Sequence, residues 1–475
     1  MANPSQVDTV AYPSRLPLTV VTSNRSGSTK KDARLVNCYL EVTDEDELWI
    51  YKRPGLAPAL IVAPNQTGNG SYYWRGAVYQ IFGNQLFRNG VSVPSGSGLD
   101  TLGGTYRFDS NLGANPQLIF GNAVATYSYT ESGGVTADLH TIDSDFPTNI
   151  VKGFAYLDGY VFVMDKEANI WNSELNSVAG ANDWNPINYI RAQIEPDGGV
   201  FLSKQLVYVV AFKEWTTEFF FNAGNAAGSP LGPVQGMKIN YGCASADSVR
   251  SIDDVLFWLC TNRGASLQVI SMDKGAVKII STAAIDRLLE NIDSSVVYSW
   301  GLKITGHSFY ILTFPYNNLT IVYDIVMDKW SQWTDKDGNF FPIIDSTYDQ
   351  DGRHVLQHTT NGRTYYCNTT YYKDLDDPIQ VDIITPIFDA NTRRRKQLNR
   401  LEFIADQTSG SIVEVRKSDD DYITWSPWRR VDLSVKRPAM INCGTFVKRA
   451  YHIRHKSNTH FRIQALEVQY DIGTL

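Results

Sequence analysis

The chain has 475 residues and carries 43 lysines and arginines against 50 aspartates and glutamates, for a net charge of −7. Hydrophobic residues make up 43% and charged residues 20% of the chain, which excludes an intrinsically disordered protein and is typical of a globular protein with a large core. No run of about 18 apolar residues is present, so we expect no membrane-spanning helix. The 26 tyrosines, 21 phenylalanines and 11 tryptophans favour β-sheets.

The cysteines and the N-terminus indicate the compartment. The five cysteines are odd in number and widely separated, which does not fit a disulfide framework. The first residues lack the basic start and apolar stretch of a secretory signal. We therefore expect assembly in a reducing cytoplasm.

The chain divides into three expected parts. Residues 1–69 are predicted to be an N-terminal entry segment whose strands help to close a blade. Strands are expected at residues 35–42 and 48–51, and Arg53-Pro54-Gly55 ends the second, because proline cannot donate to a sheet and glycine permits a turn.

Residues 70–385 repeat one theme, in which two short apolar strands flank a tight turn. The strands begin at residues 79, 124, 160, 207, 255, 309 and 354, at separations of 45, 36, 47, 48, 54 and 45 residues. A recurrence of about 40–50 residues is typical of β-propeller blades, each of which needs neighbours to bury its apolar faces. The sequence predicts an all-β fold with six or seven blades, depending on whether the N-terminal strands complete the last one.

One helix interrupts this pattern. Ile285, Leu288, Leu289 and Ile292 follow a helical period, and Thr282 is placed to cap the start. We expect a short helix inserted between blades, where its apolar side covers a blade edge.

Residues 386–475 alternate with period 2 and lack the blade spacing, which predicts an antiparallel, sandwich-like module. This part is basic. Residues 391–463 contain 16 lysines and arginines against 7 aspartates and glutamates, or +9, and the remainder of the chain contains 27 against 43, or −16. A basic module on an acidic body is typical of nucleic-acid binding or of docking onto an acidic protein face.

The strongest charge feature is the run Arg393, Arg394, Arg395 and Lys396, with Arg400 close by. Such a run could neutralise phosphates, connect two domains as a solvated linker, or bind carboxylates of a neighbouring subunit. The sequence leaves these three interpretations open.

Catalytic, metal and cofactor sites are not expected. The chain contains no nucleophile elbow, zinc-protease motif or phosphate-binding loop. His354 and His358 have a spacing that suits metal binding on a helix, but turn residues bracket them, and in a strand residues four apart are about 13 Å distant. The run Asp419-Asp420-Asp421 lacks the ordered ligand spacing of a calcium loop.

Several segments resemble one phage family. Residues 191–200 contain Glu195-Pro196-Asp197-Gly198, residues 206–212 form a strand, and residues 216–224 contain Thr217-Glu218-Phe219 before a glycine. This order is similar to that of the P22-type phage tail hub family, also called packaged DNA stabilization proteins or gp10-like tail accessory factors. Asn37 to Tyr39, Arg53 to Leu56 and the helix at residues 285–292 match the same family in order.

The resemblance implies a structural virion protein of a short-tailed phage (a podovirus), with no catalytic activity, cofactor or small-molecule substrate. Six copies would form a hub or nozzle ring in the tail, below the portal and its adaptor, after assembly in the host cytoplasm. The ring would help to retain packaged DNA, conduct it during ejection with transient contact, and dock tail fibres or spikes. On this interpretation the run from Arg393 to Lys396 faces a neighbouring subunit or the adaptor.

The alternative is a carbohydrate-binding or glycosidic propeller of a tail fibre. That function requires a pocket ringed by aromatic side chains, for instance near Trp171, Trp184 and Trp215, with a close pair of carboxylates.

Overall fold

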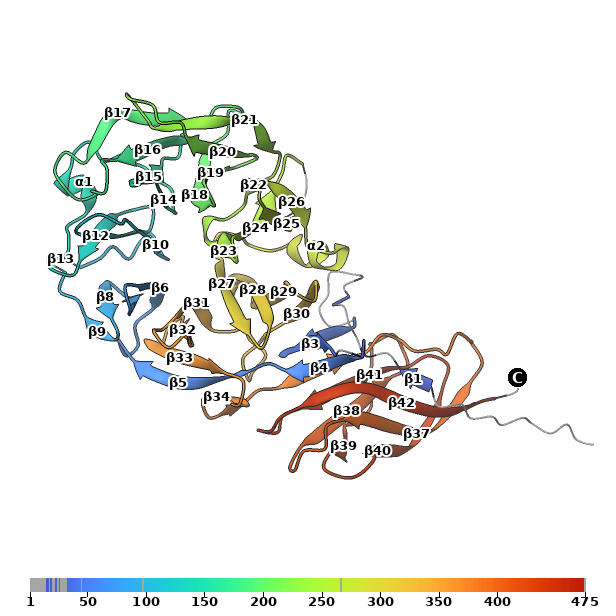
Figure 1. The fold of residues 1–475 in the computed structure, drawn as a ribbon. Helices are drawn as coiled ribbons and strands as arrows, with labels where there is room; N and C mark the ends of the chain where they lie inside the picture. The colour runs from blue at the N-terminus through green and yellow to red at the C-terminus, as the bar shows by residue number, and fades with distance from the viewer. Residues whose placement is uncertain are drawn as a thin grey trace, which may run out of the picture.

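The computed structural model describes residues 14–16, 18, 22–23, 25, 32–43, 45–95, 98–264 and 267–473. Parts of the expected N-terminal segment, including residues 1–13 and 26–31, lie outside the described residues. The described chain forms a β-propeller with a β-sandwich packed beside it (Figure 1). The β-propeller prediction is therefore confirmed, and within the described residues the blades number seven.

The first four blades are antiparallel sheets of consecutive strands. They are β6 (Gly68–Trp74), β7 (Ala77–Phe82), β8 (Gln85–Arg88) and β9 (Val91–Ser92); β10 (Arg107–Ser110), β11 (Leu118–Gly121), β12 (Thr126–Thr130) and β13 (Gly134–Val135); β14 (Ala155–Leu157), β15 (Tyr160–Met164), β16 (Asn169–Ser173) and β17 (Trp184–Arg191); and β18 (Gly199–Gln205), β19 (Tyr208–Lys213), β20 (Thr217–Asn222) and β21 (Leu231–Ile239).

The last three blades are less regular. They are β22 (Gly242–Cys243) and β23 (Arg250–Ile252) with β24 (Val255–Thr261), β25 (Gln268–Asp273) and β26 (Ala276–Ile279); β27 (Tyr298–Ile304), β28 (His307–Phe314), β29 (Leu319–Asp324) and β30 (Lys329–Gln332); and β31 (Ile343–Tyr348), β32 (His354–His358) and β33 (Arg363–Asn368) with β5 (Gly55–Ile61). The short strands β34 (Lys373–Asp374) and β35 (Asp377–Pro378) extend the seventh sheet beyond β5.

The N-terminal part of the chain closes the ring. Strand β5 pairs antiparallel with β33, from Asn368↔Gly55 to Arg363↔Ile61, and so supplies the fourth strand of blade 7. Joining residues this far apart in sequence fixes the first and last blades together. This closure accounts for the seventh blade.

The repeat pattern in the sequence located the second strand in six of the seven blades. In blade 2 the strand expected from residue 124 is β12, the third strand, and the second strand is β11. Strand β11 has only four residues, all buried, and ends in glycine, so it shows no alternation. This shift by one strand explains the irregular separations of 45 and 36 residues.

Apolar clusters fill six of the seven interfaces between blades. Each contains between nine and fifteen buried residues. The interface between blades 7 and 1 differs, because its cluster contains only Ala63, Phe82 and Phe87. Polar bonds replace the apolar contacts there: the amide of Gln357 accepts from Gly70 N at 2.8 Å and donates to Ile81 O at 2.8 Å.

Helix α2 (Ala283–Leu289) lies between blades 5 and 6, as expected. The Thr282 side chain accepts a hydrogen bond from Ile285 N at 3.4 Å and caps the first turn. Ile285, Leu288 and Leu289 are buried in the cluster that blades 5 and 6 share. The other helices are the short α1 (Leu139–Ile142) and the 3-10 turns η1 (Ala246–Ser248) and η2 (Pro315–Asn317).

Both ends of the chain build the sandwich. One sheet contains β1 (Ser14–Leu16), β3 (Cys38–Val42), β4 (Leu48–Lys52), β42 (Arg462–Ile472), β37 (Lys396–Ala405) and β40 (Ala439–Phe446). The other contains β2 (Arg34–Val36), β36 (Val381–Ile384), β41 (Ala450–His455), β38 (Ile412–Ser418) and β39 (Arg429–Asp432), and it continues through β2 into β30 of blade 6.

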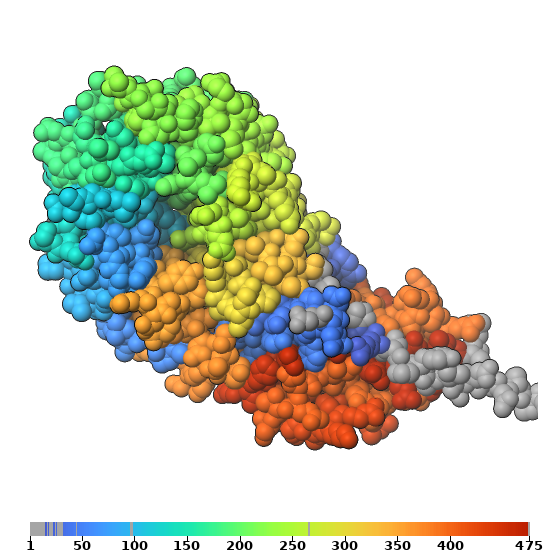
Figure 2. All heavy atoms as spheres, viewed as in Figure 1, coloured from blue at the N-terminus to red at the C-terminus, as the bar shows by residue number. Residues whose placement is uncertain are grey.

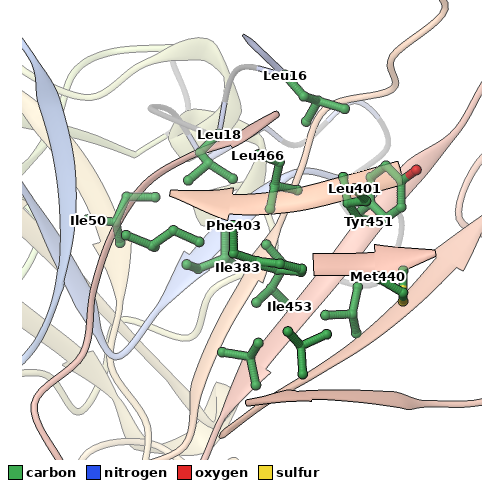
Figure 3. Packing of buried hydrophobic residues seen from close by; sticks show 14 of the residues in the cluster. Leu16, Leu18, Ile50, Ile383, Leu401, Phe403, Met440, Tyr451, Ile453 and Leu466 are labelled. Atoms are coloured by element: carbon green, nitrogen blue, oxygen red, sulfur yellow. The ribbon is translucent and has the colours of Figure 1, made fainter. Parts of the chain in front are cut away.

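The sandwich core mixes these two sources. Leu16, Leu18 and Ile50 from the N-terminal part pack with Phe403 and Leu466 from the C-terminal part (Figure 3). The sandwich forms a lobe beside blades 6 and 7 (Figure 2). Apolar residues at the N-terminus are thus buried by the last strands of the chain.

The strands cross the divisions expected at residues 69/70 and 385/386. Strands β1 to β4 belong to the sandwich, β2 also pairs with β30 of blade 6, and β5 completes blade 7. Strand β36 precedes residue 386 but already pairs with β41, for example at Ile383↔Ile453. The sandwich therefore consists of residues from both chain ends.

Candidate interaction surfaces

The predicted arginine run lies on the loop before β37. Arg393, Arg394 and Arg395 are exposed, and their side chains form no ion pair with the described residues. Arg395 is also held through its backbone, because its carbonyl accepts from Gly473 N at 2.8 Å. Three adjacent guanidinium groups are therefore presented to solvent at one edge of the sandwich.

Lys396 behaves differently from its neighbours. Its side chain is 0% exposed, and Nζ donates to the carbonyls of Asp389 at 2.7 Å and Thr392 at 2.6 Å. Its ammonium also lies 5.5 Å from the Phe446 ring centroid. Lys396 thus holds the loop in place through these two carbonyls, and it is not part of the exposed surface.

Arg400 is half-buried and paired within the sandwich. Its Nε donates to Glu402 Oε2 at 3.1 Å, and Glu402 also binds Arg437 at 2.7 Å. These hydrogen bonds hold the pKa of Glu402 below its usual value. Of the five predicted contact residues, three are left free for a partner.

A second charged surface covers the outer face of the sheet around β38 and β41. The guanidinium groups of Arg416 and Arg454 lie 4.4 Å and 4.5 Å from the ring of Trp428, and Arg416 also lies 4.9 Å from Trp425. Such stacking holds arginine side chains in place while leaving part of each cation accessible. The sequence analysis missed this surface, although two tryptophans three residues apart beside a basic segment were the available signal.

A chain of hydrogen bonds fixes these arginines. Arg416 Nε donates to His452 Nδ1 at 3.1 Å, and His452 Nε2 lies 2.6 Å from Asp382 Oδ1, which also binds Arg454 at 2.8 Å. Burial lowers the pKa of His452. Although burial opposes ionisation of Asp382, hydrogen bonds and charge from His452 and Arg454 lower its pKa to about 2. The geometry fits a neutral histidine that donates to an ionised aspartate.

Arg53 joins the sandwich to the propeller. Its side chain is 1% exposed and binds both oxygens of Asp374, with Nη1···Oδ1 at 2.9 Å and Nη2···Oδ2 at 2.5 Å. It also donates to Asn37 Oδ1 at 2.9 Å and lies 4.5 Å from the Phe341 ring centroid. Asn37 in turn donates to Thr334 Oγ1 at 2.9 Å. The Arg53-Pro54-Gly55 segment thus anchors the chain where it passes from the sandwich to blade 7.

The segment around Glu195-Pro196-Asp197-Gly198 contains a buried ion cluster. Lys213 is 0% exposed, and its Nζ lies 2.8 Å from Asp197 Oδ1 and 2.6 Å from Glu218 Oε1. Nζ also donates to the Glu195 carbonyl at 2.7 Å, and Ile194 N donates to Glu218 at 3.1 Å. Hydrogen bonds and the charge of Lys213 outweigh burial and lower the pKa of Asp197. These residues are structural and attach the loop between blades 3 and 4 to blade 4.

Charged side chains cross the axis of the propeller. Asp247, in η1 between β22 and β23 of blade 5, binds Arg107 of blade 2 at 3.3 Å and Lys152, before blade 3, at 2.7 Å. Arg250 of blade 5 binds Asp345 of blade 7 at 2.9 Å. The axis is therefore closed by ion pairs and cannot admit a DNA duplex.

The histidines and aspartates considered in the sequence analysis have local roles. His354 Nε2 accepts from Lys303 N at 3.2 Å, and His358 Nδ1 accepts from Thr360 N at 3.1 Å. Burial lowers the pKa of both histidines to about 4. Asp419 pairs with Arg449 at 2.6 Å.

Two of the tryptophans considered for the carbohydrate alternative, Trp171 and Trp184, lie in the apolar cluster between blades 2 and 3. Trp184 is buried against Phe146, with ring centroids 4.9 Å apart, and its indole donates to Val178 O. Trp171 donates to Asp165 at 3.0 Å and lies 4.7 Å from the ring of Tyr189. Both indole N–H groups are thus engaged within blade 3 and its connections.

Solved structures of other proteins share low similarity with this chain. The extracellular domain of a putative hybrid two-component system from B. thetaiotaomicron is 10% identical to this chain, with a TM-score of 0.42. The match covers 76% of this chain and 44% of that protein chain. The computationally designed Ika8 protein is 10% identical, with a TM-score of 0.38 over 66% of this chain and 99% of the design. Raptor from Chaetomium thermophilum is 12% identical, with a TM-score of 0.37 over 67% of this chain and 29% of Raptor. These scores are too low to bear on function.

No curated protein matches the chain. A family model described as bacteriophage P22 Gp10, β-propeller, matches residues 50–372. The match begins at β4, includes Arg53 and the Lys213 cluster, and ends just after β33, so it covers all seven blades. The chain therefore belongs to the phage P22 Gp10 β-propeller family.

Proposed function

We propose that this chain is a non-enzymatic structural protein of the tail of a short-tailed phage. Copies of it, six on the family resemblance, would form a hub or nozzle ring below the portal and adaptor. The ring would help to retain packaged DNA, conduct it during ejection and dock tail fibres or spikes. The observation that carries this proposal is the family match over residues 50–372.

The distribution of charge supports docking through the sandwich. Residues 391–463 carry +9 and the rest of the chain −16, so a basic lobe is joined to an acidic body. Exposed arginines without internal partners bind carboxylates of another surface well, because each guanidinium donates two parallel hydrogen bonds. Arg393, Arg394 and Arg395 are such residues, and we propose that they contact a neighbouring copy or the adaptor.

The closed axis supports a DNA path outside the propeller. Because ion pairs cross the centre of the blades, DNA would pass through the lumen between copies. An acidic wall suits that role, since it repels phosphates and lets DNA slide.

The assembly of purified components tests the docking proposal. The triple variant Arg393→Gln, Arg394→Gln and Arg395→Gln removes three charges and leaves the buried Lys396 intact. Ring formation on a portal–adaptor complex is measured by electron microscopy and sedimentation. We expect the variant to lose ring formation at physiological salt, while its unfolding midpoint stays within about 0.5 kcal/mol of the parent protein.

A matched control removes three exposed cations from the propeller, through Lys166→Gln, Arg191→Gln and Lys274→Gln. The control should assemble like the parent protein. If the triple arginine variant also forms rings normally, the docking proposal fails. Phage particles that carry the variant, assemble normally and leak DNA would place the arginines at the lumen. Glycan binding or hydrolysis by the purified chain would instead favour the carbohydrate alternative.

A further inference from the structure

A cavity of about 190 Å³ lies on the propeller axis, beside the ion pairs that close it. Its walls come from the inner strands of blades 1, 2, 4, 5 and 7 and from the segment before β14 of blade 3, which surround the axis (Figure 1). Gly153 lets blade 3 approach closely, because a Cβ there would lie 2.1 Å from Leu202 O. The cavity is thus an intrinsic feature of the way the blades converge.

Aromatic rings form much of the wall. The rings of Tyr72 and Phe108 stack with their centroids 5.6 Å apart. The guanidinium of Arg107 lies 5.9 Å from the ring centroid of Phe201. Tyr106 and Phe154 complete the aromatic lining. Flat apolar walls of this kind suit a planar organic group.

The charges at the cavity do not balance. Arg107, Arg250 and Asp345 line the cavity. Asp247 lies beside it and pairs with both Arg107 and Lys152, and Arg250 pairs with Asp345. Three cations thus face two anions. Burial and the nearby charge of Arg250 lower the pKa of Arg107 to about 10, which leaves it a cation at neutral pH. Among these five groups one positive charge is in excess.

Two buried donors at this cavity lack partners. Arg107 is 7% exposed and Ser71 is 6% exposed, and neither Arg107 Nε nor Ser71 Oγ forms a hydrogen bond in the described structure. Buried polar groups are normally satisfied, so such donors call for an acceptor. An acceptor that also carries a negative charge would supply both missing interactions.

We propose that the axial cavity is a binding site for a small anion with a carboxylate or phosphate group, held by Arg107, Arg250 and Ser71. Any planar part of the molecule would lie against Tyr72, Phe108 and Phe201. A bound anion would join blades 1, 2 and 5 at the centre of the ring. The proposal is independent of what the sandwich docks against.

The test uses the purified full-length chain, with inorganic phosphate and benzoate as probes and chloride at equal ionic strength as reference. An anion that binds only the folded protein raises the unfolding midpoint with concentration by mass action. We expect phosphate, benzoate or both to raise the midpoint above the chloride reference. The probe that raises the unfolding midpoint more shows whether the site prefers phosphate or carboxylate.

Three variants locate the effect. Ser71→Ala removes a hydroxyl that has no partner, so it leaves the fold intact and tests the site even if other variants unfold. Arg107→Lys keeps the charge but removes Nε, and Arg191→Lys makes the same change at an exposed position of blade 3. We expect Arg107→Lys to weaken anion binding at least about tenfold, Ser71→Ala to weaken it less, and Arg191→Lys to have no effect.

Two outcomes would overturn the proposal. If neither anion stabilises the parent protein beyond chloride, the cavity holds only water. If stabilisation is equal in the parent protein and all three variants, the anion binds elsewhere.

Discussion

The buried cluster of Lys213, Asp197 and Glu218 makes the sharpest prediction about the fold. All three side chains are at most 1% exposed, so replacing Lys213 with methionine leaves two carboxylates without a cation inside blade 4. Removing one partner of a buried ion pair costs about 3–5 kcal/mol. We expect Lys213→Met to lower the free energy of unfolding by that amount at pH 7.

The way the stability loss of Lys213→Met depends on pH shows whether the unpaired carboxylates cause it. In the parent protein the pKa of Asp197 is depressed, so its contribution to stability is present above the ordinary carboxyl pKa and lost as the pH falls. Without Lys213, burial raises the pKa of Asp197, so the variant loses stability as the pH rises. The difference between the two proteins should therefore be largest at neutral pH and shrink toward pH 4.

Urea denaturation at pH 7, 5.5 and 4.5, followed by tryptophan fluorescence, measures this difference. Lys204→Met, on an exposed lysine of the same blade, should change stability by less than about 0.5 kcal/mol. Adding Glu218→Gln to Lys213→Met should recover part of the loss, because one buried charge is removed. A loss below about 1 kcal/mol, or one that does not vary with pH, would refute the reasoning.

Three further predictions concern other parts of the molecule. Arg53→Met should loosen the sandwich from the propeller, seen as faster limited proteolysis near residues 53–55 with the far-ultraviolet circular dichroism unchanged; unchanged proteolysis would contradict its anchoring role. Asp382→Asn should remove about 2 kcal/mol of stability that the parent protein has above pH 4 and loses as the pH falls toward 2, because the folded pKa is about 2 against an ordinary 3.8; parallel stability–pH curves would contradict this. Thr282→Ala should cost about 1 kcal/mol in thermal unfolding through loss of the α2 cap, and Thr282→Ser should restore most of it.

The propeller was predictable because each blade repeats a short physical pattern. Runs such as Tyr160–Met164, between turn residues, reveal buried strands, and their spacing reveals the blades. The α2 helix was predictable for a similar reason, since its apolar period and Thr282 cap are local. The shift in blade 2 arose where β11 is too short to show alternation.

Long-range pairing was not predictable in the same way. Nothing local shows that β1 and β4 pair with β42, the last strand of the chain, more than 400 residues away. Nor does the run from Arg393 to Lys396 show that its last member is buried. Lys396 is the first residue of β37 and turns inward, whereas the three arginines lie on the loop before the strand and remain exposed.

The polar interface between blades 7 and 1 also depends on distant residues. Gln357 and Gly70 meet only when β5 has joined blade 7. The sequence indicated that N-terminal strands were available for this closure but not which of them would take part. The structure assigns that role to β5, directly after the Arg53 anchor.

A reconstruction of the intact phage tail at a resolution that shows side chains tests the central claim most directly. The account predicts copies of this chain in a ring below the adaptor, with Arg393, Arg394 and Arg395 at a protein contact and the DNA path between copies. Density for DNA along the propeller axis, or a ring in which these arginines line the DNA channel, would contradict it.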